Sequence, residues 1–170
     1  MSTAHPVKQE LLAARRRSPL LVRPGFLIRR LHQIHGALFV EETRQFGITP
    51  MQYSLMTALR ARGEIDQNGI ALEIGLERTS VAEVIPRLVT RGLLERRQSP
   101  VDRRVKLVKL TRRGVGLVRR MSAAVARAHR RTIEQIDPAE REVFLLHLVR
   151  LVEANAEIGS APLRLRTPSC

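Results

Sequence analysis

Residues 75–111 read GLERTSVAEVIPRLVTRGLLERRQSPVDRRVKLVKLT, and this stretch decides the fold. Apolar residues at positions 81, 84, 85 and 88 recur at helical spacing and predict a helix over about 78–91, followed by a stop at Gly92. Two short runs, about 94–98 and 105–110, flank a segment with turn chemistry and predict a hairpin whose tip carries Asp102, Arg103 and Arg104. A helix can enter the major groove of DNA while an arginine on a neighbouring ribbon reaches the minor groove. The stretch therefore predicts a DNA-reading helix followed by a charged wing.

Polar side chains of this segment are the candidate DNA contacts. Ser80 and Glu83 also have the spacing of a capping box, so Glu83 either secures the start of the helix or reads DNA, and both interpretations stay open. Pro86 lies well inside the helix, where it removes a hydrogen bond and should kink the axis. The predicted contacts are Arg78, Thr79, Ser80, Glu83 and Arg87 on the helix, Asp102, Arg103, Arg104 and Lys106 on the wing, and Arg112 and Arg113 as phosphate contacts.

The charge of the chain is concentrated in two blocks. Of the formal net charge of +14, residues 60–120 contribute 15 Lys and Arg against 7 Asp and Glu, and residues 1–30 contribute 7 against 1. This placement favours a polyanionic partner, although an arginine-rich surface can also reflect genome composition. Aromatic residues make up 3% of the chain and Trp is absent, which disfavours the stacking platforms that bind single strands. Duplex DNA is therefore the favoured partner.

The sequence lacks the signals that are typical of several other classes of protein. The single cysteine, Cys170, is the last residue and cannot form an internal disulfide or a multi-cysteine zinc site. Neither a signal peptide nor an apolar run of membrane-spanning length is visible, so we expect a cytoplasmic protein with no membrane partner. A glycine-rich phosphate loop, a G-x-S-x-G elbow and a His-Glu-x-x-His motif are also missing. We therefore expect neither an enzyme nor a cofactor.

The remaining chain predicts helices that position this DNA-reading segment. Residues 1–23 form a basic arm, mobile or partly helical, and residues 159–170 form a loose tail. Thr49, Pro50 and Gln52 combine an N-cap, a first-turn proline and a back-bonding glutamine, and Asp66 caps a further short helix. An antiparallel pair of long C-terminal helices would leave apolar surface that self-association covers most simply. The predicted helices span about 26–46, 50–62, 66–74, 78–91, 111–135 and 137–158.

Two strings, IALEIGLERTSVAEVIPRLVTRGLLERR at 70–97 and DRRVKLVKLTRRG at 102–114, closely resemble MarR-type winged helix-turn-helix regulators over about residues 26–157. The resemblance implies a mainly α fold with a small β-wing in a single domain, 24–158. Its DNA-binding part would be about 49–112, and its N- and C-terminal helices, about 24–47 and 113–158, would form the dimerisation region. It further implies a homodimer that binds pseudo-palindromic operator DNA, usually as a repressor. By the same resemblance Arg104 enters the minor groove and Asp102 holds it in position, since a carboxylate can pre-order a nearby guanidinium. Pro86 and the basic arm depart from the family pattern.

The resemblance also implies release from DNA by a small anionic or aromatic effector that binds in a cleft between the dimerisation and DNA-binding parts. Met and aromatic residues at helical spacing are also usual core residues, so each candidate has this second interpretation. An aromatic acid or its coenzyme A thioester is the hypothesis for the effector, with arginines at the rim binding its carboxylate or phosphates. The effector candidates are His35, Phe39, Tyr53, Met56 and Met121, with Arg29, Arg30 and Arg44 at the rim.

Sensing through a thiol or a metal is disfavoured within the family. Peroxide-sensing members need a reactive cysteine near the first helix, and residues 1–169 contain none. His32, His35, Glu41 and Glu42 do not make a compelling four-ligand zinc set. The alternative to a specific regulator is a sequence-indifferent DNA-packaging or RNA-binding protein, for which a basic surface suffices. Activation instead of repression also stays open, because the sign depends on where the operator lies.

Overall fold

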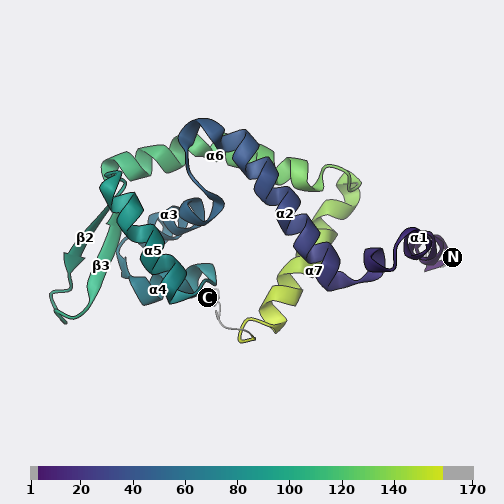
Figure 1. The fold of residues 1–170 in the computed structure, drawn as a ribbon, viewed down its shortest axis with the longest axis horizontal. Coiled ribbons are helices and arrows are strands. Elements are labelled where there is room, and N and C mark those ends of the chain that lie inside the picture. The colour runs from purple at the N-terminus through teal and green to yellow at the C-terminus, as the bar shows by residue number, and fades with distance from the viewer. Residues whose placement is uncertain (1–3, 159–170) are drawn as a thin grey trace.

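A computed structural model describes residues 4–158 as a chain of helices with one small sheet at one end (Figure 1). The predicted tail 159–170, with Cys170, lies outside the described residues. The predicted basic arm is helical over most of its described length. The α-helices are α1 Ala4–Arg17, α2 Pro24–Thr43, α3 Pro50–Arg62, α4 Gln67–Ile74, α5 Arg78–Thr90, α6 Arg112–Ile133 and α7 Arg141–Ala154; the strands are β1 Ile65–Asp66, β2 Leu94–Gln98 and β3 Lys106–Leu110; and short 3-10 turns are η1 Pro19–Val22, η2 Arg44–Phe46 and η3 Pro138–Glu140.

Local capping signals set the starts of the helices that surround the sheet. At α3 the hydroxyl of Thr49 accepts from the backbone N–H of Gln52 at 3.2 Å, and the Gln52 side chain accepts from the Thr49 N–H at 3.1 Å. At α4 the carboxylate of Asp66 accepts from two backbone N–H groups, those of Asn68 and Gly69. Both caps confirm the sequence prediction, because each depends only on residues within one helical turn.

The sheet has three antiparallel strands in the order β1-β3-β2, one more than the predicted hairpin. Strands β2 and β3 pair with Leu94 opposite Leu110, as expected for a wing. The additional strand β1 contributes two residues, with Ile65 opposite Val108 on β3. Sequence reasoning missed β1 because two residues show no alternation and their pairing partner lies more than 40 positions away.

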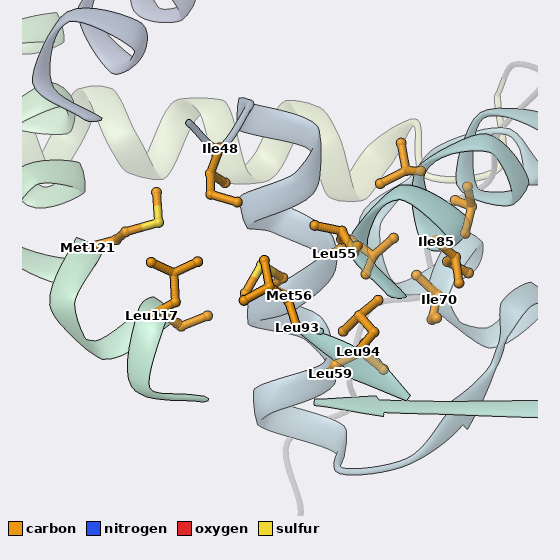
Figure 2. Packing of buried hydrophobic residues seen from close by; sticks show 14 of the residues in the cluster. Ile48, Leu55, Met56, Leu59, Ile70, Ile85, Leu93, Leu94, Leu117 and Met121 are labelled. Carbon is orange, nitrogen blue, oxygen red and sulfur yellow. The ribbon is translucent and has the colours of Figure 1, made fainter. Parts of the chain in front are cut away.

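The hydrophobic core lies around α3. Leu55, Met56 and Leu59 of this helix are buried, and residues of the sheet and of α4 to α6 close around them. Figure 2 shows Ile70, Ile85, Leu93 and Leu94 on one side of α3, and Leu117 and Met121 of α6 on the other. The core therefore holds α4, α5, the β2–β3 hairpin and the first half of α6 together as one packed unit.

Helices α2 and α6 pack along each other, whereas α7 leaves much of its apolar surface exposed (Figure 1). Arg127 and Arg131 of α6 both bind the Glu42 carboxylate of α2 at 2.8 Å. These hydrogen bonds lower the pKa of Glu42. The packed pair is thus α2 with α6, which corrects the expectation that the two C-terminal helices pair with each other. The exposed apolar side chains of α7 are Val143, Leu145, Leu146, Val149, Leu151 and Val152.

None of the helices in residues 4–158 is both long and apolar enough to cross a membrane.

The start of α6 lies unusually close to the start of β2. Thr111 caps α6 by accepting from the Gly114 N–H at 3.1 Å, and its hydroxyl donates to the Gly92 carbonyl at 2.8 Å. A Cβ at position 114 would lie 2.2 Å from the Leu93 carbonyl oxygen, a contact that the backbone cannot relieve by a change of rotamer. Glycine is required here by space, since its φ is not in the left-handed region.

We therefore expect Gly114→Ala to lower the free energy of unfolding by about 2 kcal/mol, or roughly 5 °C in the melting temperature, through overpacking against backbone. Thermal denaturation followed by circular dichroism checks this. The control is Gly116→Ala on the same helix, where the nearest atom is the flexible end of Arg120 at 3.4 Å. This variant should be as stable as the parent or more so, because alanine favours helix by about 1 kcal/mol. Equal melting temperatures for both variants would contradict the packing argument.

Candidate nucleic-acid interface

Helix α5 is held at both ends by contacts outside itself. At its start the Gln67 side chain of α4 donates to the Arg78 carbonyl at 3.2 Å. At its end the Arg91 guanidinium donates to the carbonyls of Gly47 (2.7 Å) and Phe46 (3.2 Å), in the loop before α3. Val81, Val84, Ile85 and Leu88 are buried as predicted, and they fix which face of the helix turns inward.

The capping interpretation of Ser80 and Glu83 is wrong. The N-cap of α5 is Glu77, three residues earlier, and the Val81 N–H already bonds to the Glu77 carbonyl at 3.1 Å. Gly75, with φ of 61°, reverses the chain just before this point, so Ser80 already lies in the first helical turn. Pro86 lies inside the continuous helix, on its exposed side.

The tip of the wing is ordered by short side chains. Ser99 accepts from the N–H groups of Val101 and Asp102, at 3.2 and 3.4 Å. The Asp102 carboxylate accepts from the backbone N–H of Arg104 at 2.9 Å. The Asp102 carboxylate thus fixes the backbone of the turn at Arg104, and the described contacts include no bond from it to the Arg104 guanidinium. Its expected role in positioning the Arg104 side chain on DNA stays a prediction. Two residues of separation suit a carboxylate to its own turn backbone better than to a long side chain.

Ion pairs brace the root of the wing. Arg97 of β2 donates to both oxygens of the Glu64 carboxylate, from Nε at 2.7 Å and from Nη2 at 2.5 Å. This pairing lowers the pKa of Glu64 and raises that of Arg97. Lys109 of β3 pairs with Glu95 across the hairpin at 3.1 Å. Arg97 and Lys109 are each neutralised by a carboxylate in these two pairs. The positive charge available to bind an anionic partner therefore comes from other residues.

Cations without an ion-pair partner among residues 4–158 surround the tip of the wing and the starts of α5 and α6. The side chains of Arg104 and Lys106 share a hollow of about 590 Å³ with Asp66 to Gly69 at the start of α4. Sequence reasoning missed Gln67 and Asn68 as neighbours of the wing, since only the Asp66 cap marked this turn. The exposed cations are Arg78, Arg103, Arg104, Lys106, Arg112 and Arg113.

A cavity of about 640 Å³ separates α2 from α3 and α5. His32, His35 and Gly36 of α2 form one wall. The opposite walls come from α3, from the turn before α5 and from α5 itself; they comprise Thr49, Pro50, Met51, Gln52, Ser54, Ile74, Leu76, Ser80, Glu83, Val84 and Arg87. Three residues predicted as DNA contacts, Ser80, Glu83 and Arg87, therefore line this cavity, and the structure brings them together with His35.

The structure separates the other effector candidates from this cavity. Phe39, Met56 and Met121 are 2%, 0% and 0% exposed and belong to the core, so the core interpretation applies to them. Tyr53 packs its ring against Phe39, with centroids 5.8 Å apart. Helical spacing marks an inward face without telling a packed core from a cavity wall, which is why the sequence left both interpretations open.

The predicted rim arginines also lie elsewhere. Arg29 covers the Phe26 ring at 5.3 Å, and Arg30 donates to Gln33 at 2.8 Å. Arg44 lines a separate hollow beside Glu41 and Glu42. These three guanidinium groups therefore do not surround the cavity that His35 lines.

His35 connects the cavity to α6. Its Nδ1 atom lies 2.8 Å from the Thr132 hydroxyl, which donates its own hydrogen to the Ala128 carbonyl. Nδ1 must then carry the imidazole hydrogen, which leaves Nε2 as an acceptor. The ring stacks on His129 at 4.9 Å. Burial, followed by the neighbouring His129 and His32, lowers the pKa of His35. Within residues 4–158, no group of three or more His, Cys, Asp or Glu side chains is placed to hold a metal ion.

We expect the protein to lose stability on acidification below about pH 6.5, the usual histidine value. The unfolded chain takes up the His35 proton at a higher pH than the folded chain, so stability is full above this value and falls as pH drops through the folded pKa. Melting temperatures between pH 7.5 and 5 check this. His35→Gln should show a smaller fall, and His147→Gln, at an exposed site on α7, should behave like the parent. An equal fall for all three proteins would contradict the assignment to His35.

Comparison with known proteins places these features in one family. The MarR family model matches residues 48–106, which include α3, α4, α5 and most of the wing. BpsR of Bordetella bronchiseptica, studied for regulation of its DNA binding by 6-hydroxynicotinic acid, is 32% identical and superposes with a TM-score of 0.72 over 78% of this chain and 94% of its own. The PcaV regulator of Streptomyces coelicolor, solved with its natural ligand, is 33% identical with a TM-score of 0.71 over 79% and 95%.

A relative of known function supports the same family. The transcriptional repressor NicR of Pseudomonas putida is 24% identical over 135 residues, which cover 79% of this chain and 85% of NicR. These relatives are transcriptional regulators, and their structures share the mainly helical fold with a small antiparallel sheet. The resemblance inferred from the sequence is confirmed: this chain belongs to the MarR family of winged helix-turn-helix transcriptional regulators.

Proposed function

We propose that the protein is a homodimeric repressor that binds double-stranded operator DNA and releases it when a small anionic aromatic molecule binds. The observation that carries this proposal is the double role of α5. One side of the helix lies beside the basic wing, and another side lines the cavity that separates it from α2. A molecule in the cavity would thus contact the DNA-reading helix directly.

The DNA-binding part of the proposal rests on the unpaired cations. Arg104 and Arg103 at the ordered wing tip would reach the minor groove, while Arg78 lies at the start of α5, the end that enters the major groove in helix-turn-helix proteins. Arg112 and Arg113 at the start of α6 would bind phosphates. The similarity to BpsR, whose DNA binding is regulated by a ligand, supports this reading.

Exposed apolar residues support the homodimer. Side chains of α7 and of the first half of α2, including Leu27 and Ile28, stay 42% to 59% exposed in the single chain. Helices α1 and η1 add Leu11, Leu12 and Leu20 to this apolar surface. A surface of this extent is typical of an interface, and a second copy of the chain covers it symmetrically.

The side chains of the cavity favour a small aromatic monocarboxylate over a coenzyme A thioester. Apolar walls from Met51, Ile74, Leu76 and Val84 suit a ring, and Arg87 is the one guanidinium among the described lining residues. A coenzyme A group carries several phosphate charges and would need the additional arginines that the sequence suggested at the rim. Arg29, Arg30 and Arg44 lie away from the cavity. BpsR responds to a small aromatic acid, which agrees with this preference.

Release would follow from different affinities of the effector for two arrangements of α5 and α2. A ligand that bound both arrangements equally would leave operator affinity unchanged. Because the cavity walls belong to both helices, filling it can favour one separation of α2 and α5 over another. The distance between the two α5 helices of the dimer would change together with the separation of α2 and α5.

Fluorescence anisotropy with the duplex upstream of the protein's own gene, against a scrambled duplex of equal length, tests the function. We expect binding of the native duplex at least about 1,000-fold tighter, the lower end for specific regulators. Arg104→Ala should weaken this binding by at least about tenfold while sedimentation still shows a dimer. The matched control, Arg44→Ala at an exposed arginine of η2, outside the apolar surface of α1, α2 and α7, should bind as the parent does.

Equal and steeply salt-dependent binding of duplexes of any sequence would instead support the sequence-indifferent packaging protein, because phosphate contacts alone then supply the affinity. Loss of the dimer in Arg104→Ala would contradict the position assigned to this residue.

The effector proposal is tested at Gly36, whose added side chain would enter open space on the cavity wall. Isothermal titration with benzoic acid, 6-hydroxynicotinic acid and benzoyl coenzyme A should show binding of a free acid that also lowers operator affinity. Gly36→Leu should keep DNA binding and lose the response, because its side chain occupies the cavity. The control Gly25→Leu, also on α2 with open space around it, should keep both. Binding of the thioester alone would overturn the preference for a free acid.

A further inference from the structure

Three sides of α5 can be assigned from the contacts of its residues. Val81, Val84, Ile85 and Leu88 face the core. Ser80, Glu83 and Arg87 line the effector cavity, as does Val84 at the boundary of the two. The remaining side holds Thr79, Ala82 and Pro86, which are spaced by three and four residues and therefore share one face. Thr79 and Pro86 are exposed and Ala82 is half-buried.

This third side adjoins the rest of the DNA-binding surface. Gln67 bonds to the carbonyl of Arg78, the residue next to Thr79, and also lines the hollow that holds Arg104 and Lys106. The start of α5, the start of α4 and the part of the wing around Arg104 and Lys106 thus lie together. A duplex that touches the wing cations would meet Thr79, Ala82 and Pro86, whereas Ser80, Glu83 and Arg87 lie on the neighbouring side of the helix, which lines the cavity.

The chemistry of this side is unusual for a recognition helix. Thr79, Ala82 and Pro86 present methyl and methylene groups and one hydroxyl, so none of these three side chains can make a bidentate bond to guanine or adenine. Arg78, four residues before Ala82, is the guanidinium beside them at the start of the helix. Thymine is the base that presents an apolar group, its C5-methyl, in the major groove. Pro86 also lacks an N–H, and its ring is a rigid apolar surface. The proline that departs from the family pattern therefore lies where it can contact a base.

We propose that Thr79, Ala82 and Pro86 form an apolar reading face that specifies thymines in each operator half-site through their C5-methyl groups. Sequence preference in the major groove then comes from methyl contacts, while Arg78 adds affinity and the arginines of the wing supply affinity and minor-groove readout. This inference rests on the proposed DNA-binding function.

The test starts from duplexes selected by the purified full-length protein out of a random 30-base-pair library, so that no operator has to be known. In the selected duplex each thymine is replaced in turn by deoxyuridine, which removes only the C5-methyl. Anisotropy should show about fourfold weaker binding at one or more thymines per half-site, the change expected for burial of one methyl-sized group. In Pro86→Gln, which restores the backbone N–H, at least one of these penalties should disappear. Thr90→Gln, at the far end of α5, should keep them all.

The outcomes separate this inference from the function on which it rests. A library that yields no enriched sequence would overturn both. Enriched sequences in which every deoxyuridine substitution changes affinity by less than about 1.5-fold would overturn the methyl-reading face and leave the regulator standing. Penalties that are the same in the parent and in Pro86→Gln would remove Pro86 from the reading face.

Discussion

The contact between the start of α6 and the start of β2 is the constraint on which the rest of the structure depends. Thr111 caps α6 and donates to the Gly92 carbonyl, and the backbone at Gly114 lies against the Leu93 carbonyl with no room for a side chain. The wing begins on one side of this contact, and the long helix that packs along α2 begins on the other. A rigid joint here means that a shift of α2 and α6 is passed to the wing and to α5 without being absorbed by a flexible linker.

Helix α5 is subject to three demands at once, and ten of its thirteen residues divide among them. The core requires four apolar positions, the cavity takes Ser80, Glu83 and Arg87, and the open side is left with Thr79, Ala82 and Pro86. The long polar side chains, which a sequence reader assigns to DNA, are thus drawn toward α2 and α3. In the proposed function, coupling between the cavity and DNA would follow from this division, because both surfaces belong to the same 13-residue helix.

The parts of the fold that could be predicted from sequence are those fixed by near neighbours. The caps at Thr49 and Asp66 and the buried face of α5 depend on residues within one or two turns, and the structure confirms them. The strand β1 and the cavity depend on segments that meet only after folding. Phe39, Met56 and Met121 show the limit most clearly, since periodicity gave their inward direction and could not tell whether the space they face is filled. The roles of individual residues in DNA and effector binding stay predictions.

The bond from Asp102 to the backbone of Arg104 separates the order of the wing from the order of its charges. The turn is fixed, whereas the side chains of Arg103 and Arg104 are exposed and have no ion-pair partner among residues 4–158. An arginine side chain loses up to about 2 kcal/mol of conformational entropy when it becomes ordered. Only a site with a strong electrostatic potential, such as the narrow minor groove of an A-tract, offsets this cost fully. We therefore expect the two wing arginines to favour a narrow minor groove over a wide one.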